Sequence, residues 1–286
     1  MEPLIPIDRF EIFATGIDHP ECVAFDRDGF LWAGGEAGQV YRIDPAGKVE
    51  QVCTLGSFNG GLAFSPEDEL FVCNPAKGIV RVGRDGKQEV FAMQADGTKI
   101  LCANFIVFDA AGNLYVTDSG DWQKGNGRLC RFTPDGQGKT LAGPFGYANG
   151  LALSADERFL FMVESDSERV FRFDLSTGKH AVLAEGVSRL PDGLALDSAG
   201  NLYVTCYASD DIHRVTLAGK RELVAHDRWA IKISRPTNLA FHDGWMYVAN
   251  LGRQTISRTK VDFQGQPLVN QRMRGATETQ RSQRRS

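Results

Sequence analysis

Short apolar runs separated by polar turns recur along most of the chain. One unit, an apolar strand followed by a turn and a second apolar strand, occurs as VAFDRDGFLWAGG, LAFSPEDELFVCN, IVFDAAGNLYVTD, LALSADERFLFMVE, LALDSAGNLYVTC and LAFHDGWMYVAN. Alternation with a period of two and Gly, Asp or Asn in the turns are typical of β-strands, and helical periodicity is almost absent. The pattern therefore predicts an all-β protein.

The spacing of these units narrows the architecture. Their third residues lie 39 to 45 residues apart, at Phe25, Phe64, Phe108, Leu153, Leu196 and Phe241. A third strand follows in every unit and carries an arginine at the same place, at Arg42, Arg81, Arg131, Arg172, Arg214 and Arg258. A regular repeat of this length is typical of a β-propeller with one blade per repeat. We expect a six-bladed propeller with four strands per blade.

The two ends of the chain fall outside the six repeats. The segment RFEIFATG at residues 9–16 has the character of a fourth strand with no blade ahead of it. We expect it to pair with the last blade, close the ring and remove an exposed edge, so that the propeller spans residues 1–268. Residues 269–286 are rich in Arg, Thr, Gln and Ser and are expected to form a disordered polar tail, with a weak arm for an anionic partner as the alternative.

Composition excludes several classes of function. The net charge of the 286 residues is −4 and the basic residues are dispersed, which argues against a nucleic-acid-binding surface. No apolar run approaches the roughly 18 residues that span a bilayer, so no membrane partner is expected. The N-terminal segment lacks a secretory signal pattern, and six scattered cysteines without a CxxC motif indicate reduced, buried thiols in a cytoplasmic protein. The five histidines show no close metal spacing, which argues against histidine-based zinc chemistry, and the oligomeric state stays open.

Polar residues recur at one register position, four residues before the third residue of each unit. These positions are Glu21, Gly60, Asn104, Asn149, Asp192 and Thr237. Because the innermost strand of every blade begins at the same mouth of the central channel, we expect the six residues to form a ring around the axis. Asn149 and Asp192 each precede a glycine and also fit ordinary turns, so a turn role at single positions stays open.

Two carboxylates in this ring favour a bound cation. Acids that face one confined space repel each other unless one is protonated or a cation lies between them. Carboxylate and amide oxygens are ligands that suit a hard divalent ion. We therefore expect a metal on the axis, held by Glu21, Asn149 and Asp192, with Asn104 beside it.

The third blade has the longest loop at the same mouth. The distance from the third residue of the unit to the position before the repeated arginine is 22 residues there and 16 to 18 in the other blades. The extra residues bring Asp118, Asp121 and Trp122 over the expected site, where they would form a lid or substrate wall. A solvent loop of arbitrary length is the alternative. Tyr207 and Glu164 are weaker candidates, and we interpret His213 as a structural residue that faces a sheet.

These segments resemble the senescence marker protein/regucalcin and gluconolactonase family of six-bladed propellers. The resemblance covers roughly residues 8–268 and is clearest in HPECVAFD, ANFIVFDAAGNLYVTDSG, ANGLALSADERFLFMVESDSERVFRFDL and LPDGLALDSAGNLYVTCY. It implies a single divalent cation, often calcium, with Mg, Mn or Zn as alternatives, held by Glu21, Asn149 and Asp192. It also implies that Asn104 contacts the substrate and that Asp192 acts as general base.

Two departures from the family pattern bear on the substrate. Sugar-lactone hydrolases of the family often have EGP at the first ligand, where this chain has ECV, and some have an arginine at the position of Cys102. The differences favour a less polar lactone or ester over an aldonolactone. We thus expect a metal-dependent hydrolase of a small-molecule lactone or ester. The alternatives are a non-catalytic propeller scaffold stabilised by metal, a phosphotriesterase-like enzyme, and a strictosidine-synthase-like enzyme, which generally lacks this metal triad.

Overall fold

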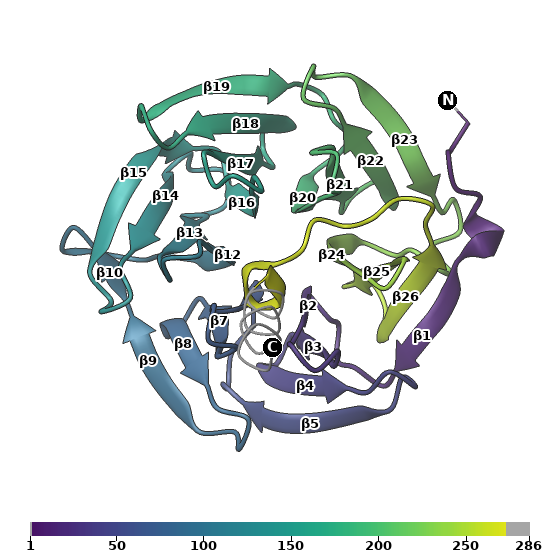
Figure 1. The fold of residues 1–286 in the computed structure, drawn as a ribbon, viewed down its shortest axis with the longest axis horizontal. Coiled ribbons are helices and arrows are strands. Elements are labelled where there is room, and N and C mark those ends of the chain that lie inside the picture. Colours follow the sequence, from purple (N-terminus) through teal and green to yellow (C-terminus); the bar gives the residue numbers. More distant parts are fainter. Residues whose placement is uncertain (1, 273–286) are drawn as a thin grey trace, which may run out of the picture.

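Six antiparallel sheets of four strands surround a central axis in the computed structural model, which describes residues 2–272. Figure 1 shows the view along this axis, with the innermost strand of each sheet beside the channel and the fourth strand on the outer rim. The predicted six-bladed propeller is therefore confirmed. Among the described residues, no helix is long and apolar enough to cross a membrane.

The first three blades follow one another in sequence. The first consists of β2 (Cys22–Phe25), β3 (Leu31–Gly34), β4 (Gln39–Ile43) and β5 (Val49–Thr54). The second consists of β6 (Leu62–Phe64), β7 (Leu70–Asn74), β8 (Gly78–Val82) and β9 (Gln88–Ala92). A small hairpin of β10 (Gln94–Ala95) and β11 (Thr98–Lys99) leads to the third blade, which consists of β12 (Ala103–Phe108), β13 (Leu114–Asp118), β14 (Gly127–Phe132) and β15 (Gly138–Phe145).

The other three blades repeat this order. The fourth consists of β16 (Ala148–Leu153), β17 (Phe159–Glu164), β18 (Arg169–Asp174) and β19 (Lys179–Ala184). The fifth consists of β20 (Pro191–Leu196), β21 (Leu202–Cys206), β22 (Asp211–Val215) and β23 (Arg221–His226). The sixth consists of β24 (Pro236–His242), β25 (Trp245–Asn250), β26 (Thr255–Lys260) and the N-terminal strand β1 (Glu11–Thr15), which a single 3-10 turn (Ile7–Arg9) precedes.

The N-terminal strand closes the ring. β1 pairs antiparallel with β26, with Glu11 opposite Arg258 and Thr15 opposite Thr255. The carboxylate of Glu11 also accepts a hydrogen bond from Arg258 Nε at 2.7 Å. The two ends of the propeller thus share one sheet, so the blade that would otherwise expose an unpaired edge is complete.

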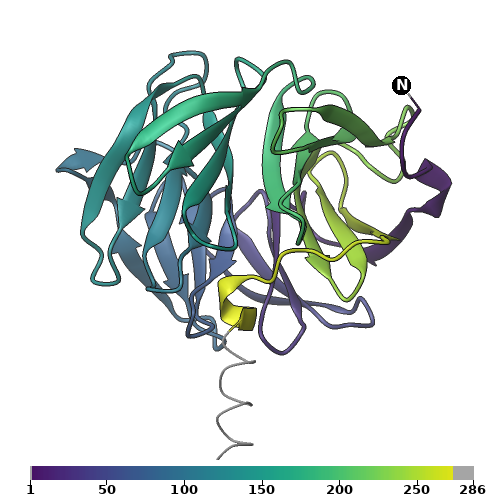
Figure 2. The same ribbon diagram turned by 45° about the horizontal axis from the view of Figure 1, so that its top comes forward.

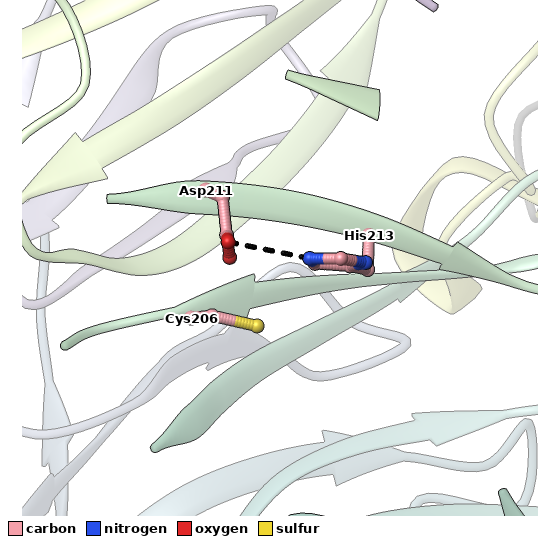
Figure 3. A group of neighbouring side chains, drawn as sticks. All are labelled: Cys206, Asp211 and His213. Carbon is pink, nitrogen blue, oxygen red and sulfur yellow. Dashed lines mark ion pairs between the residues drawn. The ribbon is translucent and has the colours of Figure 1, made fainter. Parts of the chain in front are cut away.

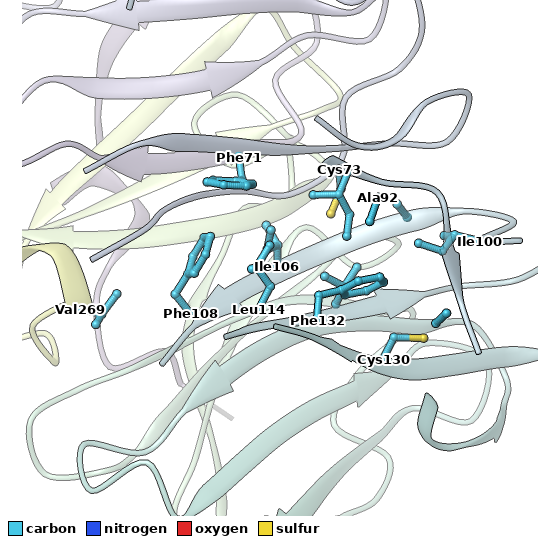
Figure 4. Close-up of a cluster of buried hydrophobic side chains, with 14 residues drawn as sticks. Phe71, Cys73, Ala92, Ile100, Ile106, Phe108, Leu114, Cys130, Phe132 and Val269 are labelled. Atoms are coloured by element: carbon cyan, nitrogen blue, oxygen red, sulfur yellow. The ribbon is translucent and has the colours of Figure 1, made fainter. Parts of the chain in front are cut away.

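The core consists of apolar layers between neighbouring blades. Figure 4 shows the layer between the second and third blades, where Phe71 and Cys73 of β7 meet Ile106 of β12 and Phe132 of β14. Phe71 also packs edge to face on Phe108, with ring centroids 5.1 Å apart. Because each inner strand is covered by a blade on both faces, its apolar residues form short continuous runs, which explains the segments seen in the sequence.

The C-terminal segment closes one end of the channel. It passes beneath the sheets to the axis and ends in a helical turn over residues 269–272 (Figure 1, Figure 2). Gln266 Nε2 donates to the carbonyl of Leu153 at 2.8 Å, and Asn270 Nδ2 donates to that of Phe25 at 3.2 Å. Both carbonyls belong to the last residue of an inner strand, so the ring at the start of the inner strands lies at the opposite, open end.

The segment leaves an apolar cavity of about 130 Å³ between itself and the inner strands. Val269 is buried in the layer between the second and third blades, so the helical turn is part of the packed core. The polar tail expected over residues 269–286 lies, from residue 273 onward, outside the described residues.

Candidate metal centre

The structure brings Glu21 and Asp192 together at the start of the inner strands. Burial raises the pKa of Glu21 to about 8, and the neighbouring side chain of Thr237 acts in the opposite direction. Burial also raises the pKa of Asp192 well above its usual value, and the charge of Glu21 raises it further. Asp192 keeps some exposed surface, whereas Glu21 is buried, so the pair lies at the inner end of an open mouth. Two acids from the first and fifth blades therefore share one confined space.

Two buried oxygen atoms at this place have no hydrogen-bond partner among residues 2–272. They are Oε2 of Glu21 and Oδ1 of Asn149. A hydrogen-bonding interaction with Asn149 also lowers the pKa of Asp192, which places the amide beside that carboxylate. A buried acceptor without a partner destabilises the folded state by the full free energy of its desolvation. These two oxygen atoms, with the carboxylate of Asp192 beside them, fit a hard divalent cation as their missing partner.

A serine fixes the orientation of Asn149. Nδ2 of Asn149 donates to Ser165 Oγ at 3.1 Å, and the hydroxyl of Ser165 donates to the carbonyl of Pro191 at 2.7 Å. Because the hydroxyl proton of Ser165 is donated to Pro191, the hydroxyl oxygen can only accept a hydrogen bond from Asn149. The amide of Asn149 must therefore turn its NH₂ group toward Ser165. The carbonyl oxygen of Asn149 consequently points away from the serine, to the side where it lacks a partner.

The same device holds Asn104 in the neighbouring blade. Nδ2 of Asn104 donates to Ser119 Oγ at 2.9 Å, and Ser119 donates to the carbonyl of Ala148 at 2.6 Å. The two asparagines are thus presented in the same way by adjacent blades. Each serine also links its own blade to the next, so the orientation of the amide depends on the closed ring.

The other two ring positions support Glu21 and the third blade. Thr237 Oγ1 donates to the backbone carbonyl of Glu21 at 2.6 Å, which ties the sixth blade to the first. Gly60 lies so close to the third blade that an added Cβ atom would be 2.6 Å from the carbonyl oxygen of Asn104. Gly60 therefore serves close packing and contributes no ligand.

The backbone ahead of the ring has an unusual conformation. The residue two positions before the ring has a positive φ in four blades, at His19 (37°), Tyr147 (61°), Leu190 (50°) and Arg235 (45°). Side chains other than glycine rarely adopt this left-handed region, and such residues are frequent near functional sites. At this residue the chain bends from the outer strand of one blade toward the inner strand of the next. The bend therefore determines the position of the backbone from which the ring side chain extends.

The loop of the third blade forms an aromatic wall with Tyr147. The ring of Trp122 packs edge to face on Tyr147, with centroids 4.8 Å apart, and 47% of Trp122 stays exposed. Burial, followed by the charges of Cys102, Asp192 and Glu21, raises the pKa of Tyr147, so its phenol lies near the acid pair and stays protonated. Trp122 thus contacts Tyr147, a residue near the acid pair that the sequence analysis did not single out.

Asp121 has a partner within its own loop. Its backbone N–H and its carboxylate are both bound to the side chain of Asn126 in the same loop, at 2.8 and 3.0 Å. Asp118 is buried and accepts hydrogen bonds from the backbone of Leu101 and Cys102 while pairing with Arg128 at 2.7 Å. Both aspartates therefore shape the loop.

The weaker candidates also have local partners. Glu164 accepts a hydrogen bond from the backbone N–H of Gly146 at 2.6 Å and another from Ser167. The hydroxyl of Tyr207 accepts one from Arg235 at 3.3 Å. His213 lies on β22, with Nε2 3.3 Å from Asp211 Oδ2.

Three site residues were missed by the sequence analysis, namely Tyr147, Ser119 and Ser165. A signal for the serines was present, because each follows an acid at the end of a second strand, in TDSGD and ESDSE. The two segments occupy the same place in adjacent repeats. Tyr147 has no such counterpart, since its position carries His, Phe, Cys, Leu and Arg in the other blades.

Comparison with known proteins agrees with this architecture. The model of the SMP-30/Gluconolactonase/LRE-like region matches residues 19–251. Protein strictosidine synthase-like 6 of Arabidopsis thaliana is 27% identical over 68% of this chain and 58% of its own length. Lactonase drp35 of Staphylococcus saprophyticus is 28% identical over 67% of this chain and 64% of its own length. The chain therefore spans less than two thirds of these curated relatives.

Solved structures share the fold at low sequence identity. A gluconolactonase from Xanthomonas campestris superposes with a TM-score of 0.77 at 18% identity, covering 90% of this chain and 89% of its own. A calcium-binding regucalcin from Agrobacterium tumefaciens superposes with a TM-score of 0.75 at 16% identity, covering 94% of this chain and 98% of its own. The family match extends over most of the propeller, and the chain belongs to the SMP-30/gluconolactonase/LRE-like family.

Proposed function

We propose that this chain is a metal-dependent hydrolase that opens a lactone or cleaves a related carboxylic ester. One observation carries the proposal: buried Glu21 and partly exposed Asp192 approach each other beside an amide oxygen of Asn149 that has no hydrogen-bond partner among the described residues. Membership of the family and the lactonases among the relatives support this type of reaction.

Glu21, Asn149 and Asp192 would hold one divalent cation at the open end of the channel. Their donors are oxygen atoms only, which favours calcium, with Mg, Mn or Zn as alternatives. The calcium-binding regucalcin of the same fold supports this choice. When bound, such a cation supplies electrophilic polarisation of a carbonyl oxygen and stabilises the negative charge that develops there.

The remaining steps belong to the side chains. Asn104, held by Ser119, orients the substrate. A carboxylate oxygen of Asp192 takes the proton of the attacking water and returns it to the alcohol oxygen that leaves when the C–O bond of the ester breaks. Burial and the charge of Glu21 raise the pKa of Asp192, which favours proton uptake. A cation held by Glu21, Asn149 and Asp192 would act in the opposite direction and keep the carboxylate of Asp192 ionised at neutral pH, as a general base requires.

The walls favour a substrate with apolar substituents. Trp122 and Tyr147 offer aromatic surface at the mouth, and Cys102 occupies the position where some sugar-lactonases have an arginine. Burial raises the pKa of the Cys102 thiol to about 11, so this position supplies no charge for a polyhydroxylated substrate. A lactone or ester with an alkyl or aryl group fits better than an aldonolactone.

A strictosidine-synthase-like activity is the second candidate, because relatives with that name match two thirds of the chain. The acid pair argues for a hydrolase that uses a cation. A reaction that needs no cation would not explain why Glu21 and Asp192 lie so close that their charges repel each other.

The test is a substrate panel assayed with and without a chelator. It contains an alkyl-substituted lactone, an aldonolactone, an aryl ester and an aryl phosphotriester. The proposal expects turnover of the alkyl lactone or the aryl ester, loss of that turnover with chelator and recovery after calcium is added. Chelator-resistant turnover, preferred turnover of the phosphotriester, or no turnover of any carboxylic ester would contradict it; the last result would favour a scaffold.

A further inference from the structure

The fifth blade carries a second group of potential metal ligands, on the two strands that lie outward from the strand of Asp192. Figure 3 shows Cys206 at the end of β21 and Asp211 and His213 on the neighbouring strand β22. Cys206 pairs directly with Asp211 in the sheet, and His213 follows two residues later. Because side chains alternate along a strand, all three project from the same face of the hairpin.

The ligand atoms of these residues lie within 4.8 Å of one another. His213 Nε2 is 3.3 Å from Asp211 Oδ2. The two atoms are within ion-pair distance, and His213 lowers the pKa of Asp211, but Nε2 is a buried nitrogen without a well-aligned hydrogen bond among the described residues. A separation of about 3.3 Å is also the N···O edge of a tetrahedron with metal–ligand distances of about 2.0 Å, as at zinc.

The other five blades provide an internal control for this group. Their residues at the positions of Cys206, Asp211 and His213 are Gly35, Gln39 and Tyr41; Asn74, Gly78 and Val80; Asp118, Arg128 and Cys130; Glu164, Arg169 and Phe171; and Asn250, Thr255 and Ser257. None of these sets combines a thiol, a carboxylate and an imidazole. The blade fold therefore does not require a thiol, a carboxylate and an imidazole at these positions, and the structure of a blade does not explain why the fifth blade has all three.

Two serines hold the carboxylate in place. Ser188 Oγ donates to Asp211 Oδ2 at 3.0 Å, and Ser209 Oγ donates to Asp211 Oδ1 at 2.9 Å. The serines come from different loops and contact each other at 2.9 Å. Hydrogen bonds from an outer layer of this kind orient the ligands of metal sites. The side chains of Asp211 and His213 remain 10% and 16% exposed, which leaves a path for an ion and a water molecule.

We propose that Cys206, Asp211 and His213 form a second cation site, distinct from the ring site, that binds Zn²⁺ through sulfur, oxygen and nitrogen. This donor set is softer than the all-oxygen ring, so the two sites select different ions. Water completes the four ligands that zinc prefers. Binding converts the Cys206 thiol to a thiolate, and the thiol proton is released to solvent.

The test uses the full chain, freed of metal with a chelator and titrated with Co²⁺ as a spectroscopic substitute for Zn²⁺. The proposal expects one equivalent of Co²⁺ with thiolate-to-cobalt charge-transfer absorption, and displacement of that ion by Zn²⁺. Cys206→Ser is expected to abolish this absorption. The matched control Cys130→Ser, which changes a buried cysteine of the third blade, is expected to keep it.

Three further variants test the site, and their folding is measured as a control. His213→Phe introduces the residue found at the same position of the fourth blade, Phe171, and Asp211→Asn preserves shape. Each is expected to weaken Zn²⁺ binding by at least about 100-fold, whereas Ser188→Ala is expected to weaken it about 10–100-fold. Their unfolding transitions without metal are measured alongside.

The variant Asp192→Asn distinguishes the ring site from the site at Cys206, Asp211 and His213. That variant is expected to lose the axial cation and turnover while keeping the thiolate–cobalt absorption. Absence of the absorption in the unmodified chain, its persistence in Cys206→Ser, or Zn²⁺ binding that is unchanged in a folded His213→Phe variant would overturn the proposal, whatever the result of the lactone panel.

Discussion

The carboxylates of Glu21 and Asp192 interact at the channel mouth, although 171 residues separate them in sequence and they belong to the first and fifth blades. Each lies in a place that disfavours its charge, and the charge of Glu21 further raises the pKa of Asp192. The protein keeps this unfavourable pair at the entry of the inner strands. A cation that binds between the acids turns the repulsion into attraction.

Replacing Glu21 with Gln is expected to change metal-free and metal-loaded stability in opposite directions. Without metal at neutral pH, the variant should be more stable by at least about 1.4 kcal/mol, the value of one pKa unit, because the unfolded chain no longer gains by ionising an acid that the folded state holds protonated beside Asp192. With calcium, the stabilisation seen in the unmodified chain should be absent. Thermal unfolding with and without calcium measures both effects. Glu50→Gln on the exposed outer strand is the control and should change neither; a metal-free Glu21→Gln variant that unfolds more easily would contradict the repulsion.

The metal-free protein is expected to lose stability as the pH rises. The pKa of Glu21 is about 8 in the folded chain and near 4.5 when exposed, so the folded state retains a proton that the unfolded state has released. Stability therefore falls between about pH 4.5 and pH 8 for this group, the reverse of an ordinary salt-bridged acid. Unfolding midpoints measured across this range in chelator test the slope. With saturating calcium, the contribution of these acids should reverse, because the ion binds to the deprotonated pair; an unchanged slope would count against a shared site.

Replacing Ser165 and replacing Ser119, the serines that orient Asn149 and Asn104, are expected to have different effects on calcium binding and catalysis. Ser165→Ala frees the amide of Asn149 and should weaken calcium binding about 10–100-fold. Ser119→Ala frees Asn104 instead and should leave calcium affinity within about 3-fold while it lowers kcat/KM. Calcium titrations and steady-state kinetics on both variants separate the roles. Equal loss of calcium affinity in the two would show that the asparagines are not divided between ion and substrate.

Trp122 is expected to act on substrate binding. Trp122→Ala removes the aromatic surface that rests on Tyr147 and should raise KM for an alkyl or aryl lactone about 10-fold, with kcat nearly unchanged. Trp229, which is 72% exposed on another loop, provides the matched control, and Trp229→Ala should leave both constants unchanged. A fall in kcat at constant KM would instead place Trp122 in the chemical step.

Asn270 is expected to contribute to stability alone. Its buried amide donates to the carbonyl of Phe25 and to Asp68, and its backbone carbonyl accepts from Arg27, at the end of the channel opposite the acid pair. Asn270→Ala should cost about 1–3 kcal/mol, because it leaves buried groups without partners. Urea unfolding measures the loss, with the neighbouring, partly exposed Gln271→Ala as control. A changed calcium affinity in Asn270→Ala would show that the two ends of the channel are coupled.

The repeat made the blades predictable from sequence. Six copies of one strand pattern specify the number of blades, and the register of Glu21, Asn104, Asn149 and Asp192 follows from counting back from the same residue in each copy. The proximity of Glu21 and Asp192 can thus be predicted from the sequence, because a closed ring of blades brings equivalent positions of the repeat to one mouth of the channel.

Features that depend on one blade alone were not predictable in this way. Tyr147 approaches the acid pair through a left-handed backbone at its own position and a contact with a loop of the preceding blade, and neither has a sequence signature. Asp121 was expected in the substrate wall, and Asn126, five residues away, binds its carboxylate within the loop. Loop partners of this kind compete with the site for a polar side chain, and sequence spacing does not reveal which one prevails.

The position of the ion tests the central claim most directly. Crystals of the protein soaked with calcium should show one axial ion at the open mouth, about 2.3–2.6 Å from oxygen atoms of Glu21, Asn149 and Asp192. The same experiment on Glu21→Gln should show an empty axis. An ion bound elsewhere, or an axis in the unmodified protein that holds only water between two protonated acids, would contradict the account.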